Sequence, residues 1–336
     1  MKVAIAILNW NGQGFLEKFL PSVIEYSSSE TTAVYVIDNA STDNSVAFMH
    51  EHYPNISLIE LDKNYGFAEG YNKGLQHINA EYFVLLNSDV QVTPHWIEPV
   101  ISYMDTHKNC AAAMPKLLSY TNPEYFEYAG AAGGFIDRYG FPFCNGRLFT
   151  KVQKDSGQYN NIKEIFWASG AALFVRSSVY WQLGGLDADF FAHMEEIDLC
   201  WRMKNRGYSI MYIPQSTVYH VGGGALPASS PFKTYLNFRN NLYLLYKNLP
   251  RENFFGTLFT RMMLDGIAFA KFILAGKFAD ARSVFKAHRD FYKALPNLKK
   301  KRNTLQQYCK AIQHPHMYNK SIVWDFYVRR KKDIAM

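Results

Sequence analysis

The chain has 336 residues, of which 48% are hydrophobic and 19% charged. This composition excludes extensive disorder, and the length exceeds what one hydrophobic core usually supports. The net charge of +7 is uneven: residues 282–336 hold 14 Lys and Arg against three Asp and Glu, so they carry +11 and the rest −4. This asymmetry excludes a uniformly basic nucleic-acid binder and indicates a basic tail that meets an anionic surface, with membrane lipid as the leading candidate.

Predicted strands and helices alternate at the start of the chain. The strands are expected over residues 2–8, 32–37, 55–61 and 82–86, with a helix at 15–26. This alternation predicts an α/β fold with a central, mostly parallel, doubly wound sheet. Ligands bind beyond the carboxyl ends of the strands in such sheets, so the polar residues Asp38, Asn64 and Asn87–Asp89 are expected along one edge.

The rest of the chain is irregular at first and then helical. Residues 107–192 are expected to form short strands and loops that line a pocket, with a strand over 166–175 that bends at Gly170. The later elements are expected as a helix over 195–205 that ends at Gly207, a strand over 209–213, and helices over 231–248 and 252–294.

No targeting or redox signal is expected from the sequence pattern. The apolar run at 2–8 is too short for a signal peptide, and no run reaches about 18 uncharged apolar residues, so no transmembrane helix is predicted. Four cysteines lack metal-binding or redox spacing and are expected to be free thiols in a reducing compartment. They are Cys110, Cys144, Cys200 and Cys309.

Two acidic motifs are the first candidates for chemistry. Asn87-Ser88-Asp89 follows a predicted strand, where a carboxylate either holds Mg²⁺ or Mn²⁺ or simply caps the next helix. Glu195, Glu196 and Asp198 open a predicted helix, where a carboxylate acts as a general base or forms a charged first turn that the helix dipole favours. Because neighbouring helix positions face different directions, only one of Glu195 and Glu196 is expected to point inward.

A histidine and a glycine run complete the pattern. His220 precedes Gly222–Gly224. An imidazole can complete the ligand shell of a metal, and glycines let backbone amides approach a phosphate. The alternative is that His220 is a structural histidine. Asp38 suits a ribose or base contact, and Trp10 either stacks on a base or packs in the core. Together the motifs suit a metal-held diphosphate with a nearby base, which is the chemistry of sugar transfer from a nucleotide-sugar.

Taken in order, these segments resemble family 2 glycosyltransferases of the GT-A fold, especially rhamnosyltransferase-like enzymes of bacterial surface polysaccharide. The matching runs are Leu8–Gly12, Val36–Asp43, Asn64–Ala68 with Gly70 and Asn72, Leu85–Asp89, Ser169–Ala171, Gly184–Asp187 with Phe190 and Phe191, Glu195–Arg202, Gly207, Tyr208, Pro214 and His220. The resemblance implies a GT-A catalytic domain at 1–230, with a nucleotide-binding half at 1–106 and an acceptor half at 107–230. A helical, basic extension would follow at 231–336.

The resemblance also implies roles for single residues. Asp89 matches the last acid of the family's metal-binding D-x-D, Asn87 replaces its first acid, and His220 matches a metal ligand of some relatives. Glu196 stands where the family has the Asp general base, and its extra methylene moves the carboxylate by roughly 1 Å, so the base would be Glu196 or Glu195. The nucleotide-sugar site would comprise Asn9, Asp38, Asn39, Asn64, Gly66, Asn72, Asn87 and Ser88. The sugar and acceptor pocket would comprise Trp167, Ser169, Gly170, Gly185, Asp187 and Asp198.

The expected activity is inverting transfer from a UDP- or dTDP-sugar, with Mg²⁺ or Mn²⁺, to a glycan or a lipid-linked acceptor. The apolar segment 254–275 and the basic tail favour a peripheral location on the cytoplasmic face of the inner membrane, without nucleic-acid binding; packing on the catalytic domain or in a homodimer is the alternative. The competing functions are a nucleotidyltransferase, for which residues 9–14 lack a convincing phosphate loop, and a degenerate sugar-nucleotide-binding module.

Overall fold

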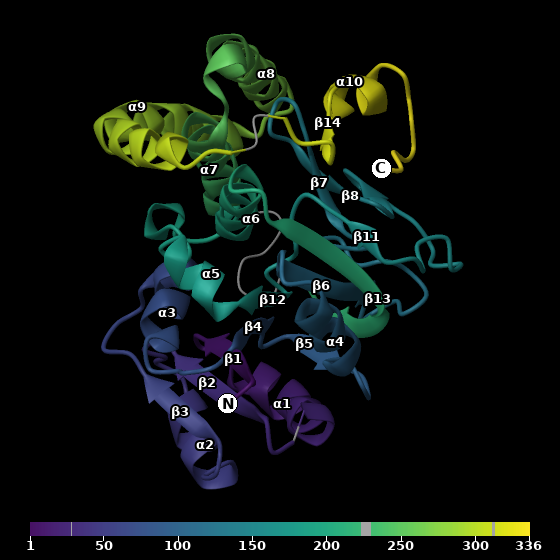
Figure 1. Ribbon diagram of the computed structural model, residues 1–336. Helices are drawn as coiled ribbons and strands as arrows, with labels where there is room; N and C mark the ends of the chain where they lie inside the picture. Colours follow the sequence, from purple (N-terminus) through teal and green to yellow (C-terminus); the bar gives the residue numbers. More distant parts are fainter. Residues whose placement is uncertain (28, 223–229, 311–312) are drawn as a thin grey trace.

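A mixed β-sheet forms the centre of the molecule, and long helices and a second, small sheet lie on one side of it (Figure 1). The computed structural model describes residues 1–27, 29–222, 230–310 and 313–336. The strands are β1 (Val3–Asn9), β2 (Thr32–Asp38), β3 (Ser57–Glu60), β4 (Tyr82–Asn87), β5 (Val90–Val92), β6 (Cys110–Ser119), β7 (Gly134–Asp137), β8 (Pro142–Cys144), β9 (Arg147–Leu148), β10 (Lys151–Val152), β11 (Lys163–Glu164), β12 (Ala172–Arg176), β13 (Ser209–His220) and β14 (Met317–Tyr318). The α-helices are α1 (Gln13–Ser27), α2 (Ser45–His52), α3 (Gly66–Leu75), α4 (Glu98–Thr106), α5 (Ser177–Gln182), α6 (Glu195–Asn205), α7 (Pro231–Asn248), α8 (Phe254–Leu274), α9 (Phe278–Gln307) and α10 (Ile322–Tyr327).

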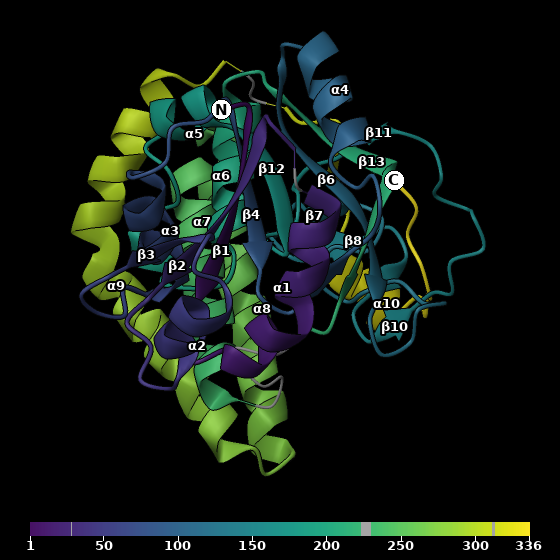
Figure 2. The ribbon, with the colours of Figure 1, turned by 90° about the horizontal axis from the view of Figure 1, so that it is seen from below.

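The central sheet has the strand order β11-β13-β6-β12-β4-β1-β2-β3, with β5 paired to β13. Strands β3, β2, β1 and β4 are parallel, whereas β12 runs antiparallel to both β4 and β6. Helices α1 and α4 lie on one side of the sheet and α3, α5 and α6 on the other (Figure 2). The predicted α/β class is therefore confirmed, and the sheet is mixed in its second half.

Burial on both faces explains the apolar runs in the sequence. Residues 3–7 of β1 and 82–86 of β4 are buried throughout, because helices cover both sides of these strands. Tyr71 of α3 adds a polar tie, since its hydroxyl donates to the Leu86 carbonyl (3.0 Å) across this core. The parallel strands therefore end together, and the loops that follow them share one edge.

Three expectations about elements need correction. The helix expected over 252–294 is two helices, α8 and α9, because the chain turns at Gly276, whose φ of +68° is a conformation that favours glycine. The strand expected over 166–175 begins only at Ala172, because residues 170–171 form a turn. The strand expected over 209–213 instead continues to His220.

The expected boundary at residue 230 does not divide the packing. β14 pairs with β7 in the small sheet, whose order is β10-β9-β8-β7-β14, and α7 packs on both α6 and α9. Within the described ranges, no helix is both long and apolar enough to cross a membrane. The four cysteines are free thiols, as predicted.

Candidate active site

Two strands bring Asp89 and His220 together. β5 runs antiparallel to the end of β13 with Val90 opposite His220, and the Val221 N–H donates to the Asp89 carbonyl (3.1 Å). His220 Nε2 lies 3.1 Å from Asp89 Oδ1, and both side chains are buried. The register of one strand pair therefore joins two residues that are 131 positions apart.

A third acid, Glu127, belongs to this cluster and was missed in the sequence, where it is a lone acid between aromatic residues. Its Oε1 lies 3.4 Å from His220 Nδ1, and its Oε2 accepts the Ala129 N–H (2.5 Å). Burial alone would lower the pKa of His220, but the hydrogen bonds and charges of Asp89 and Glu127 outweigh burial and raise it to about 10. Burial raises the pKa of Asp89, and its pairing with His220 more than offsets this, so the pKa falls below its ordinary value.

The donor set of this cluster fits a divalent cation. A carboxylate, and an imidazole once its Nε2 proton is released, are oxygen and nitrogen ligands for Mg²⁺ or Mn²⁺, which usually keep waters and substrate phosphates as further ligands. Asn87 lies at the same place, with its amide nitrogen 3.5 Å from His220 Nε2. Across the described part of the chain, no group of three or more His, Cys, Asp or Glu side chains is placed to hold a metal ion.

The expected glycine-rich loop is only partly visible. Gly223 and Gly224 lie outside the described residues. Gly222 is described: its φ is +73°, and a Cβ there would lie 3.0 Å from Glu127 Oε1. This glycine therefore allows the chain to pass close to the acidic cluster.

A strained segment presents the two candidate bases. Phe191, His193 and Met194 have φ values of 65°, 68° and 71°, which non-glycine residues rarely adopt. The Asn240 amide of α7 holds this segment by donating to the carbonyls of Phe190 (3.0 Å), Ala192 (2.8 Å) and His193 (2.7 Å). Helix α6 begins directly after it, so α7 fixes where the helix and its acids start.

Glu196 lies beside the bend at Gly170. A Cβ on Gly170 would be 3.8 Å from Glu196 Cγ, and the next residue, Ala171, accepts the Asn87 N–H (3.0 Å). The same bend therefore contacts the base candidate and the strand end before Asp89. Burial raises the pKa of Glu196 to about 7, although backbone N–H groups of the first helical turn oppose this.

Glu195 is even more enclosed, at 4% exposure. Burial and the charge of Glu196 raise the pKa of Glu195 well above its ordinary value. Glu196 is partly exposed, but one carboxyl oxygen of each residue is buried, so the expectation that only one of the two would point inward is wrong. One carboxyl oxygen of each lacks a hydrogen-bond partner among the described residues.

The predicted nucleotide residues meet at the sheet edge and hydrogen-bond to one another. Asn9 and Asp38 are register partners at the ends of β1 and β2, and Asp38 accepts from the Asn9 amide (3.1 Å). Asn39 donates to Asn64 Oδ1 (3.1 Å) and to the Gly66 carbonyl (3.0 Å). Their first role is therefore to shape the loops that would surround a nucleotide.

Two neighbours complete this edge. Trp10 is 51% exposed just beyond β1, so the alternative of a core aromatic is excluded and its ring is free for stacking. Ser88 is partly buried in the turn after β4, and a Cβ on Gly12 would lie 3.7 Å from its hydroxyl. These two residues flank the end of β1.

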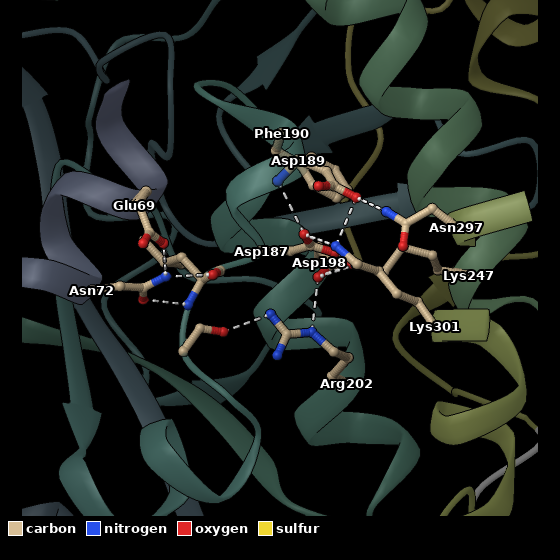
Figure 3. Close-up of polar contacts among 12 residues, drawn as sticks. Glu69, Asn72, Asp187, Asp189, Phe190, Asp198, Arg202, Lys247, Asn297 and Lys301 are labelled. Carbon is tan, nitrogen blue, oxygen red and sulfur yellow. Dashed lines mark hydrogen bonds and ion pairs between the residues drawn. The ribbon is translucent and has the colours of Figure 1, made fainter. Parts of the chain in front are cut away.

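Asn72, seen in Figure 3 beside Glu69, and Gly185 have structural roles, contrary to prediction. The Asn72 amide donates to the Leu186 carbonyl (2.7 Å), and its oxygen accepts from the Leu186 N–H (3.0 Å) and the Tyr180 hydroxyl (2.7 Å). The Gly185 carbonyl accepts from Arg202 (2.9 Å). With these atoms in use, both residues join α3 and α6 to the 183–187 loop.

The carboxylates of Asp187 and Asp198, which were predicted at the acceptor site, are likewise held in ion pairs within the protein. Figure 3 shows them sharing Lys247 of α7, and Lys301 of α9 adds a contact of 2.5 Å to Asp187. Asp198 is fully buried and also accepts from Arg202 (2.8 Å). This buried charge network joins the catalytic half to the C-terminal helices.

The predicted sugar-pocket residues divide in the same way. Trp167 is 3% exposed, and its indole N–H donates to the Phe135 carbonyl (2.8 Å), so it is a core residue and the prediction is wrong. The Ser169 hydroxyl donates to the Ala129 carbonyl and accepts the Ala171 N–H (3.2 Å), which shapes the bend. Gly170 alone is partly exposed beside Glu196.

This sheet has the arrangement of the GT-A fold, with an acid–histidine pair at its edge and an acidic helix start nearby. Residues 4–163 match the model of glycosyl transferase family 2. The chain is therefore a glycosyltransferase, and its match to family 2 lies in this segment of just under half its length.

Curated relatives share this region. The chain is 26% identical over 223 residues to the N-acetylglucosaminyl-diphospho-decaprenol L-rhamnosyltransferase of Mycobacterium tuberculosis, covering 61% of this chain and 71% of the relative. It is 22% identical to rhamnosyltransferase WbbL of Escherichia coli over 65% of this chain and 83% of the relative. The resemblance to rhamnosyltransferase-like enzymes is therefore confirmed.

Solved structures show the same fold at low identity. GalNAc-T7 with UDP, GalNAc and Mn²⁺ has a TM-score of 0.58 at 15% identity, covering 74% of this chain, which spans about half (48%) of GalNAc-T7. S. aureus TarS 1–349 has a TM-score of 0.56 at 14% identity over 92% of this chain and 87% of that one. The mannosyltransferase PcManGT of Pyrobaculum calidifontis, with GDP-Man and Mn²⁺, has a TM-score of 0.52 at 15% identity over 91% and 85%.

Proposed function

We propose that this chain is an inverting glycosyltransferase that moves a sugar from a nucleoside-diphosphate-sugar to a glycan or lipid-linked acceptor in cell-surface polysaccharide biosynthesis. The observation that carries the proposal is the Asp89–His220 pair at the sheet edge, with Glu196 at the neighbouring bend. The Asp89–His220 pair can bind the leaving diphosphate through a cation, while Glu196 receives a proton.

Glu196 is the proposed general base. Its ionised carboxylate takes the proton of the acceptor hydroxyl as the oxygen attacks the anomeric carbon, and the bond from that carbon to the diphosphate oxygen breaks on the opposite face. This displacement inverts the anomeric configuration. A bound Mg²⁺ or Mn²⁺ would supply positive charge that neutralises the departing diphosphate, and Asp89 and His220 would hold it.

We assign the nucleotide to the sheet edge at the ends of β1 and β2, because an exposed aromatic ring and hydrogen-bonded loops lie there. Trp10 would stack on the base, and the loops fixed by Asp38 and Asn39 would enclose the ribose. UDP and dTDP are the proposed carriers; the solved GalNAc-T7 structure, which shares this fold, contains UDP. A rhamnosyl or hexosyl donor is supported by the names of the relatives.

A lipid-linked acceptor is supported by the Mycobacterium tuberculosis relative, whose name includes a diphospho-decaprenol. Such an acceptor would place the reaction at a membrane, and we infer that the enzyme works peripherally on its cytoplasmic face. The nucleotide-sugar donor would then reach the site from the aqueous side.

The test is release of nucleoside diphosphate from a panel of UDP-, dTDP- and GDP-sugars, with and without Mg²⁺ or Mn²⁺. We expect metal-dependent release from one donor, at least about 10²-fold lower in Asp89→Asn. Asp333→Asn is the matched control, because Asp333 is exposed and far from the site in the sequence. Metal-independent turnover, or equal turnover in Asp89→Asn, would contradict the metal assignment, and donor binding without turnover on any acceptor would favour the binding-module alternative.

A further inference from the structure

Helix α8 has an inverted distribution of polar and apolar side chains. Ten of its eleven exposed residues are apolar or glycine, and Lys271 is the exception. Phe255 and Leu274 are 82% and 89% exposed, near the two ends of the helix. The exposed apolar face, called here the α8 face, comprises Phe255, Phe259, Met263, Ile267, Phe269, Ile273 and Leu274.

Arg261 and Asp265, two of the three charged residues of α8, are buried and point into the protein. Arg261 donates to Asp265 (2.8 Å) and to Asn241 of α7, and its guanidinium lies 4.1 Å from the Phe141 ring. Asp265 also pairs with His288 of α9 (3.1 Å). These bonds fix the rotation of α8 about its axis, so the apolar side is held outward, where water would make it unfavourable.

Helix α9 extends this surface and adds positive charge. Phe278, Phe285 and Tyr292 are exposed and seven residues apart, so they share one side of the helix, and the Tyr292 hydroxyl contacts Met262 of α8 (3.6 Å). The exposed charged residues of α9 are all basic. They are Arg282, Lys286, Arg289, Lys293, Lys299 and Lys300.

Helix α10 adds the aromatic residues that favour a lipid–water interface. Trp324 and Tyr327 are more than half exposed, and the Lys271 ammonium lies 4.9 Å from the Tyr327 ring, which ties α10 to the end of α8. Figure 1 shows α8, α9 and α10 at one end of the molecule, with β3 and α2 at the opposite end. Apolar, basic and interfacial aromatic side chains therefore gather on the end away from the nucleotide half.

We propose that the α8 face docks on an anionic lipid bilayer, with α8 parallel to the surface, the apolar side chains among the acyl chains and the basic residues of α9 at the headgroups. This deepens the proposed function by naming the contact surface, and it rests on that function only for its biological purpose. A second copy of this chain is a poorer occupant, because a symmetric interface would bring the basic surfaces of two α9 helices together.

The test is flotation of the full chain with vesicles of 30% phosphatidylglycerol or of neutral phosphatidylcholine alone, without any nucleotide-sugar. We expect binding to the anionic vesicles, with Ile267→Glu weakening it at least about tenfold. Ile162→Glu is the matched control: the same exchange at an exposed isoleucine outside this surface, expected to bind as the wild type does. Neutralising Arg282 or Arg289 to Gln should weaken anionic-vesicle binding by roughly fivefold each, and Lys108→Gln should not.

Each outcome decides the proposal. Selective loss in Ile267→Glu supports it, provided that donor hydrolysis in detergent stays at the wild-type rate. No vesicle binding by the wild type, or equal binding by Ile267→Glu, overturns it. A dimer in sedimentation velocity that Ile267→Glu dissociates, without vesicle binding, assigns the face to a second copy instead. Failure of donor hydrolysis would contradict the proposed function while leaving vesicle binding to be judged by itself.

Discussion

At the scale of single residues, two adjacent glutamates have different surroundings. Glu195 is enclosed, and burial and the charge of Glu196 raise its pKa well above its ordinary value. Glu196 is partly exposed beside Gly170, and its pKa of about 7 suits a base that must be ionised at neutral pH and still accept a proton. The environment therefore distinguishes two residues that the sequence leaves equivalent.

Glu196→Gln should lower turnover by about 10²- to 10⁴-fold, because the amide cannot accept the proton. Wild-type kcat/KM should rise with pH through an apparent pKa near 7, since the raised pKa keeps Glu196 protonated and inactive below that value. Steady-state rates between pH 5 and 9 test both points. Glu195→Gln is the control and should retain most activity, because Glu195 is buried whereas Glu196 is partly exposed. Loss of turnover in Glu195→Gln, with full activity in Glu196→Gln, would exchange the two roles.

Glu127 is the proposed positioning residue for His220. Its carboxylate lies against His220 Nδ1, an arrangement that orients a metal-ligating imidazole. Glu127→Gln should therefore weaken the apparent affinity for Mn²⁺ by about 10- to 100-fold, measured as the metal dependence of donor release. Glu124→Gln, at an exposed acid in the same loop, should not change the affinity; equal affinities in both variants would reduce Glu127 to a structural role.

At the scale of elements, α7 controls the site without providing a catalytic residue. Asn240 holds the strained segment before α6, and Lys247 pairs with Asp187 and Asp198. Lys247 is 1% exposed, so its ion pairs are shielded from water. The start of α6, and with it Glu196, depends on contacts that arrive from a later helix.

Lys247→Ala should lower the free energy of unfolding by on the order of 3 kcal/mol, because it leaves two buried carboxylates short of a partner. Burial raises the pKa of Asp187, but the charges of Lys247 and Lys301 outweigh burial and lower it. The stabilisation from these ion pairs is therefore present above about pH 4 and is lost in acid. Urea unfolding at pH 7 and pH 3 measures the difference, which should shrink at pH 3. Lys293→Ala on α9 is the exposed control; equal stabilities of the two variants would contradict the network's role.

The sequence predicts elements where the pattern is local. α6 and α7 have the predicted bounds, because apolar periodicity and clear ends lie within each segment. The small sheet was not predicted in detail, since strands of two to four residues have no period, and β14 comes from the far end of the chain. Asp187 and Asp198 were misassigned for the same reason. The lysines that pair with their carboxylates, Lys247 and Lys301, are about 50 or more positions away in the sequence.

Asp89, His220 and Glu196 could be selected from the sequence because each follows or opens a recognisable element. Glu127 could not, because it lies in an irregular loop and only the β6–β13 pairing brings that loop to His220. Trp167 was misassigned because an aromatic beside a glycine bend gives no sign of which way the ring points. The motifs therefore predict which charged residues lie near the site. Contacts with residues distant in the sequence decide which of these side chains are available to bind a ligand.

At the scale of the whole molecule, the catalytic half and the C-terminal helices share one network of buried charge. A chain of residues 1–230 should therefore fail to fold, because Asp187 and Asp198 would lose Lys247 and Lys301. We expect no cooperative urea transition and no donor binding by calorimetry, whereas the full chain shows both. A cooperative transition with donor binding in the 1–230 fragment would show that the boundary first expected from the sequence is correct.

The turn between β4 and β5 has a consequence for how this sequence can change in evolution. Asp89 meets His220 only because Val90 stands opposite His220, so one inserted residue between Asn87 and Val90 would turn the acid to the other side of the sheet. The surface loop at 153–162 carries no such constraint, because none of its side chains reaches the acid–histidine cluster in the contacts described. Descendants of this gene should therefore differ in length at 153–162 and keep the spacing from Asn87 to Val90 unchanged.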